Sequence, residues 1–168
     1  MKTSVSSYSF GDYIKHEKLG INGIIVKAKE MGFDGIEFLD RDIRDVEHAR
    51  EVAAFAKEQD IAIVAFCVGA DFVNKNAEEE IARVKALVDI AAALGVPVMR
   101  HDIAPGSKSG AKLGISYDAL LPQMASAVRE IAEYAQARGV RTVTENHGYF
   151  SQDANRVEKL IKIGRAHV

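Results

Sequence analysis

The chain has 168 residues, 48% of them hydrophobic and 27% charged, which is typical of a folded domain and excludes a disordered segment. Its 22 Lys and Arg residues against 24 Asp and Glu residues give a formal net charge of -2, so we expect no nucleic-acid partner. The single Cys67 excludes an internal disulfide framework, and neither a signal peptide nor a membrane-spanning run is expected, which predicts a cytoplasmic protein without a membrane partner.

Short apolar or β-branched runs alternate along the chain with longer stretches of helical period, which predicts parallel strands joined by helices. The expected strands are Thr3–Tyr8, Gly35–Leu39, Ile61–Phe66, Pro97–His101 and Val140–Glu145. The expected helices are Ile21–Met31, Val46–Gln59, Ala77–Leu94, Tyr117–Arg138 and Ala154–Lys162. Glycine follows three of the helices at a position where a left-handed cap is expected.

Two architectures have this alternation, an open doubly wound sheet and a (β/α) barrel. The segment after the first strand, Ser6–Gly11, lacks the glycine-rich phosphate turn of a nucleotide-binding open sheet. Polar residues instead follow the second, fourth and fifth strands, and a barrel spreads its site over several strand ends in this way. We therefore predict an α/β fold, an incomplete (β/α)8 TIM barrel of about five units over residues 1–162, because whole barrels need about 250 residues.

The second and fourth strands each carry a candidate site residue. Alternation places Glu37 on the side opposite Ile36, in or near the packed interior, where a carboxylate needs a partner. His101 shares its face with Met99, while its two neighbours in sequence point the other way. A structural ion pair for Glu37 and a hydrogen-bonded core position for His101 are the alternatives to a functional role.

The exit of the fifth strand combines a carboxylate, an amide and an imidazole in Glu145, Asn146 and His147. If the extended backbone continues, Glu145 and His147 point the same way and could hold one divalent cation or one substrate. The alternative is a loop capped by Asn146 with a solvated His147.

With these strand ends assembled, the chain resembles the xylose-isomerase-like barrel superfamily of sugar-phosphate isomerases and epimerases over nearly its whole length. The residues that carry the resemblance are Gly32–Glu37, Leu94–Val96 and Thr144–Gly148. The resemblance implies a divalent metal cation, Mn, Mg, Co or Zn, and a substrate that is a small-molecule sugar or sugar phosphate. It also implies that a carboxylate moves a proton beside the sugar carbonyl, where a Lewis-acidic cation stabilises the developing charge.

The same resemblance identifies Glu145 as the metal ligand and the proton-transfer base. It implies that Glu37, His101 and His147 bind sugar hydroxyls or position the metal. The remaining ligands of the family belong on strands six to eight, so we expect the metal in the full-length parent, with this fragment binding it weakly and inactive alone.

The final residues, Ile163–Val168, fit poorly with the apolar pattern of Val157, Leu160 and Ile161 that precedes them. They are the translation of ATC GGA AGA GCA CAC GTC, a common short-read sequencing adapter. We predict that the native sequence ends near Ile161 and that residues 163–168 are a non-native tail, the alternative being a genuine short tail.

An open five-stranded sheet leaves backbone groups unpaired along its outer strands, so we expect self-association through the sheet edges. The leading functional hypothesis is a fragment of a metal-dependent sugar isomerase or epimerase. The alternative is an inactive fragment or a non-enzymatic binding module, in which Glu37 and His101 are structural. DNA repair on the same barrel is disfavoured by the near-neutral charge.

Overall fold

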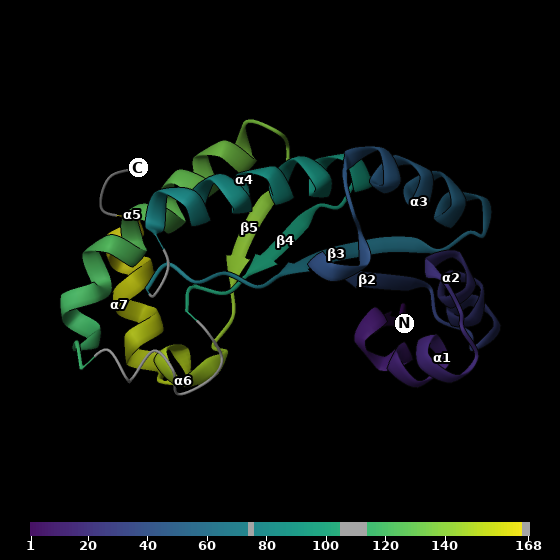
Figure 1. The fold of residues 1–168 in the computed structure, drawn as a ribbon, viewed down its shortest axis with the longest axis horizontal. Coiled ribbons are helices and arrows are strands. Elements are labelled where there is room, and N and C mark those ends of the chain that lie inside the picture. The colour runs from purple at the N-terminus through teal and green to yellow at the C-terminus, as the bar shows by residue number, and fades with distance from the viewer. Residues whose placement is uncertain (74–75, 105–113, 166–168) are drawn as a thin grey trace.

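The computed structural model describes residues 1–73, 76–104 and 114–165 and shows one curved parallel sheet with helices packed along it (Figure 1). The strands lie in sequence order, each paired in parallel with the next along the chain. They are β1 Ser4–Ser6, β2 Gly35–Leu39, β3 Ala62–Val68, β4 Val98–His101 and β5 Arg141–Thr144. Sequential order with every strand parallel is the arrangement of a partial TIM barrel, as predicted.

The predicted helices are all present, with ends that differ by a few residues. They are α2 Ile21–Glu30, α3 Val46–Glu58, α4 Ala77–Leu94, α5 Tyr117–Gln136 and α7 Ala154–Arg165. Four short elements were not predicted: η1 Ser7–Phe10, α1 Gly11–His16, η2 Asp40–Asp42 and α6 Gly148–Ser151. The prediction that the first strand reaches Tyr8 is wrong, because η1 begins at Ser7 and the Ser6 hydroxyl accepts the Tyr8 amide at 3.3 Å.

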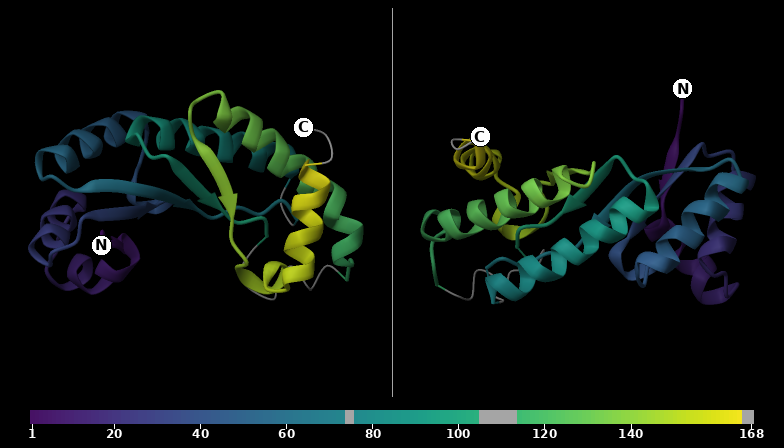
Figure 2. Two further views of the ribbon diagram at one scale, coloured as in Figure 1. Left: turned by 180° about the vertical axis from the view of Figure 1, so that it is seen from behind. Right: turned by 90° about the horizontal axis from the view of Figure 1, so that it is seen from above.

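Within the described ranges, helices α3, α4 and α5 follow one another along the outer side of the sheet, and none of these three helices covers its inner side (Figures 1 and 2). Strand alternation explains which residues face the helices. Ile36 and Phe38 on β2 and Met99 on β4 are fully buried, and the α4 positions Val84 and Val88 pack in the same core. The hydrophobic core therefore lies between the sheet and its outer helices.

Helix ends follow the capping rules that the sequence indicates. Gly95 ends α4 in the left-handed region with a φ of 72°. At the other end of α4 the Asn76 side chain accepts the Glu78 amide at 3.1 Å and donates to the Glu79 carboxylate at 3.3 Å. These caps fix where α4 starts and stops, and thereby where β4 begins.

The pairing of β2 with β3 contains a register shift. Ile36 is opposite Ile63, but Glu37 is opposite Ala65, so Val64 is passed over. A Cβ on Gly35 would lie 2.7 Å from the Val64 Cγ1 and 2.9 Å from the Ala62 carbonyl oxygen. Only glycine fits this close approach, and the shift decides which β3 side chains reach the inner side.

Within the described ranges no helix is both long enough and apolar enough to cross a bilayer. The helix α7 continues through Arg165, so residues 163–165 extend it. Residues 166–168 lie outside the described part of the chain, and the non-native tail stays a prediction.

Candidate functional site

Four polar side chains meet where β4 and β5 end, and we call them the β4–β5 cluster: Arg100, Asp102, Glu145 and His147. The Arg100 Nε lies 2.8 Å from the Glu145 Oε2, and its Nη1 donates to the Asp102 Oδ1 at 3.0 Å. The same Asp102 oxygen lies 3.1 Å from the His147 Nδ1. One guanidinium thus joins two carboxylates, and one of these carboxylates joins the histidine.

Strand register explains why these residues meet. Arg100 on β4 is directly opposite Val143 on β5, so both face the inner side. Residues two positions further along point the same way while the backbone stays extended, which brings Glu145 next to Arg100. The predicted common orientation of Glu145 and His147 agrees with this geometry, because both contact the same Arg100–Asp102 pair.

Burial divides the cluster into a fixed part and an open part. The side chains of Asp102 and Arg100 are 13% and 23% exposed, whereas those of Glu145 and His147 are 48% and 51% exposed. The β4 residues are therefore held against the sheet, and the β5 residues are open to solvent and to a ligand. Such a cluster can accept hydroxyl hydrogen bonds and can take up or release a proton at the carboxylate or the imidazole.

Glu37 lies on the inner side of β2, as alternation predicts, and has a partner there. The Cys67 thiol of β3 donates to the Glu37 Oε2 with a separation of 3.6 Å. Burial, and then the negative charge of Glu37, raise the pKa of the Cys67 thiol to about 11. The positive charge of Arg100 lowers the pKa of Cys67, and the negative charge of Glu145 raises it. Cys67 therefore interacts electrostatically both with Glu37 and with two members of the β4–β5 cluster.

The structure does not bring His101 together with the other three predicted site residues. His101 is 1% exposed and packs edge-on against Phe72 with ring centroids 6.1 Å apart, on the helix-covered side of β4. Its Nδ1 donates to the Asp102 carbonyl oxygen at 2.8 Å. Burial lowers the pKa of His101 below its ordinary value of 6.5, so the ring is neutral in the core.

Sequence reasoning passed over Arg100 and Asp102 as site residues. The signal that could have found them is the alternation that places them on the face opposite His101 and Met99. A strand end on the inner side that carries a cation beside a carboxylate indicates a polar site more directly than a histidine beside an apolar neighbour.

A second polar cluster fixes the segment after β3. The carboxylate of Glu80 is buried at 3% exposure and accepts the Asp71 amide at 2.9 Å. Arg83 pairs with the same carboxylate at 2.7 Å and also donates to the Gly69 carbonyl. Asp40 after β2 accepts the Gly69 amide at 3.1 Å, so this cluster holds two neighbouring strand ends together. The buried Glu80 carboxylate thus positions the backbone that follows β3.

The described residues do not by themselves form a metal site. No group of three or more His, Cys, Asp or Glu side chains in the described ranges has an arrangement that could hold a metal ion. Glu145, the predicted ligand, is engaged by the Arg100 guanidinium. The residues present supply at most part of a coordination sphere.

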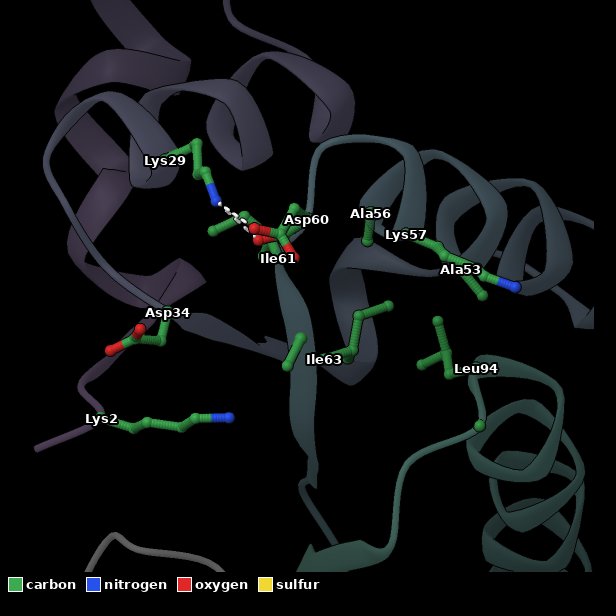
Figure 3. A pocket seen from close by; sticks show the side chains of 12 residues that line it. Lys2, Lys29, Asp34, Ala53, Ala56, Lys57, Asp60, Ile61, Ile63 and Leu94 are labelled. Carbon is green, nitrogen blue, oxygen red and sulfur yellow. Dashed lines mark hydrogen bonds and ion pairs between the residues drawn. The ribbon is translucent and has the colours of Figure 1, made fainter.

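A cavity of about 520 Å³ opens at the other end of the sheet, near the amino ends of β2 and β3 (Figure 3). Figure 3 shows Lys29 directed toward Asp60, and their charged atoms lie 2.8 Å apart. Barrel enzymes place their chemistry at the carboxyl ends of the strands, and the amino ends contribute stability. The cavity is therefore not the candidate site.

Comparison with solved structures shows the same fold in proteins of different function. The probable 3-DHS dehydratase AsbF of Bacillus anthracis has a TM-score of 0.77 at 18% identity, over 99% of this chain and 60% of that chain. D-Psicose 3-epimerase of Clostridium cellulolyticum H10 has a TM-score of 0.76 at 17% identity, over 98% of this chain and 60% of that chain. AP endonuclease, family 2, of Brucella melitensis has a TM-score of 0.72 at 18% identity, over 98% of this chain and 66% of that chain.

Identities this low show the fold alone, and the chain spans 60% to 66% of the length of these structures. Comparison of the sequence with curated proteins gives no match. The model of one protein family, the xylose isomerase-like TIM barrel, matches residues 25–167. With five parallel strands in barrel order and polar residues at their carboxyl ends, the chain belongs to the xylose isomerase-like TIM barrel family.

Proposed function

We propose that this chain is part of a divalent-metal-dependent sugar or sugar-phosphate isomerase or epimerase that acts by proton transfer next to a carbonyl. The observation that carries the proposal is Glu145, a half-exposed carboxylate at the carboxyl end of β5 in a chain of this family. An epimerase among the similar structures supports the reaction class.

Each residue on the inner side then has a role of its own. Glu145 accepts the proton beside the carbonyl, since its carboxylate is open to a ligand and is held in place by Arg100. His147 and Glu37 face the inner side and hydrogen-bond sugar hydroxyls. His101 contributes through the carbonyl of Asp102, because its ring lies in the core on the other face.

A second candidate function is a non-enzymatic binding module or an inactive fragment. The observation that favours it is that Glu145 and Glu37 both have partners within the chain, Arg100 and Cys67. In that case both carboxylates stabilise the open inner side, and no substrate is turned over.

Titration of the chain with Mn²⁺ separates the two candidates. Binding that is lost in Glu145→Gln and retained in Glu47→Gln, an exposed carboxylate on α3, is expected if Glu145 belongs to a metal site. Equal binding by the unchanged chain and Glu145→Gln would remove Glu145 from the metal site. Independent sequencing of the gene beyond codon 161 gives a second test, because Asp, His and Glu codons at the ends of three further strands are expected.

A further inference from the structure

The contact between Asp102 and His147 joins two acceptor atoms unless a proton lies between them. The Asp102 Oδ1 lies 3.1 Å from the His147 Nδ1, which is within hydrogen-bond distance. An imidazole nitrogen without a proton is an acceptor, and so is each oxygen of an ionised carboxylate, so two such atoms would repel each other here. The contact is therefore a hydrogen bond only if one of the two groups carries a proton.

Arg100 determines which group carries that proton. Its Nη1 donates to the same Asp102 oxygen at 3.0 Å, and the two side chains form an ion pair. A carboxylate paired with a guanidinium accepts hydrogen bonds and donates none, so the proton lies on the His147 Nδ1. The Asp102 side chain is 13% exposed, which shields both hydrogen bonds from solvent.

The two ring nitrogens of His147 then have opposite roles. A neutral ring that carries its proton on Nδ1 has a lone pair on Nε2, at the other side of the ring. No group among the described residues hydrogen-bonds this Nε2, and the His147 side chain is 51% exposed. The Nε2 is therefore an acceptor open to a ligand, and the ligand group that matches it is a donor such as a hydroxyl.

We propose that Asp102 is a positioning residue, which fixes the Nδ1–H tautomer of His147 and so presents Nε2 as an acceptor for a ligand hydroxyl. The assignment of that hydroxyl to a sugar rests on the proposed function, whereas the tautomer is a property of the chain alone. Asp102 suits this role because Arg100 holds it at the end of β4, while His147 lies on a segment that is open to solvent.

Two other histidines provide references for the two tautomers. The His48 Nδ1 accepts the Arg44 amide at 3.2 Å, so the proton of its neutral ring lies on Nε2. The His101 Nδ1 donates to the Asp102 carbonyl oxygen at 2.8 Å, so its proton lies on Nδ1. The ¹⁵N spectrum of the ring nitrogens distinguishes these forms, because a protonated nitrogen resonates well upfield of an unprotonated one.

The first test is this spectrum of the unchanged chain at about pH 8.5, where a histidine of ordinary pKa is neutral. The His147 resonances are identified by their loss in His147→Gln. We expect them to match the pattern of His101, with the proton on Nδ1. A pattern that matches His48 instead would overturn the proposal without any variant of Asp102.

The second test is Asp102→Ala, which removes the acceptor. The ratio of the Nδ1–H to the Nε2–H tautomer of His147 is expected to fall about tenfold. The His101 pattern should persist, since it depends on a backbone carbonyl, and it reports that the variant is folded. Asp89→Ala removes a carboxylate paired with Arg138 on the helical surface and is the matched control. An unchanged ratio in Asp102→Ala would overturn the positioning role.

A titration with D-fructose tests the ligand part of the proposal. Its hydroxyls are expected to move the His147 Nε2 resonance upfield in the unchanged chain, and to move it less in Asp102→Ala. An Nε2 resonance that does not respond would overturn the role toward a hydroxyl. The proposed function fails separately, if Glu145→Gln and the unchanged chain bind Mn²⁺ equally, because the tautomer is measured without a metal.

Discussion

The two faces of β4 have different surroundings, although adjacent residues build them. His101 points into the helix-covered core, where it is neutral and packed against Phe72, whereas Arg100 points to the open side and joins two carboxylates. A step of one residue along a strand therefore separates a packing role from a polar site. The face of the strand on which a residue lies therefore indicates its role better here than its residue type does.

The largest expected effect tests the packed face. Phe38→Ala removes a fully buried ring from the outer face of β2 and should lower the free energy of unfolding by about 3–5 kcal/mol. Leu39→Ala, next to it on the partly exposed inner face, should cost only about 1 kcal/mol. Urea denaturation followed by circular dichroism measures both. Equal losses would mean that the two faces are packed alike.

A smaller effect is expected from the pH dependence of His101. Burial lowers its pKa in the folded chain below 6.5, so the unfolded chain binds more protons just below that pH. The stability that neutral His101 contributes is complete above pH 6.5 and is lost as the pH falls toward the lowered pKa.

The free energy of unfolding is measured by urea denaturation at about pH 7.5 and at about pH 5.5. His101→Gln should lose less stability between these two conditions than the unchanged chain, while His16→Gln, which alters an exposed residue of α1, should follow the unchanged chain. A pH dependence that is identical in all three proteins would show that His101 does not titrate in this range.

The smallest effect concerns a thiol on the inner face. Because the pKa of Cys67 is raised to about 11, by burial first and by Glu37 next, its alkylation by iodoacetamide at about pH 8 should be slow. Glu37→Gln removes the charge that opposes thiolate formation and should accelerate the reaction about threefold. Glu30→Gln on α2 is the control. No acceleration in Glu37→Gln would place the carboxylate away from the thiol in solution.

Much of the fold could be predicted from the sequence because periodicity and caps are local signals. The alternation around Ile36 and the asparagine and glycine that bound α4 are visible in the chain itself. The short helix α1 could not be predicted, since six residues carry too little periodic pattern. The end of β1 depends on a single serine hydroxyl that turns the backbone.

The candidate site was predictable only in part. Glu145 and His147 could be placed together from their spacing along one strand, and in the structure both contact the Arg100–Asp102 pair. Their partners Arg100 and Asp102 come from another strand, and that contact depends on the register between β4 and β5. Register is set by packing over the whole sheet, so no short segment of sequence reveals it.

The register shift at Val64 also affects how β3 tolerates changes in length. Because Val64 is passed over between Ile63 and Ala65, its deletion would restore regular pairing and keep every later side chain on its present face. Deletion of Phe66 would instead move Ala65 into the position of a buried ring. Deletion of one residue from β3 should therefore leave the site intact at Val64, whereas deletion two residues later, at Phe66, should disrupt the core.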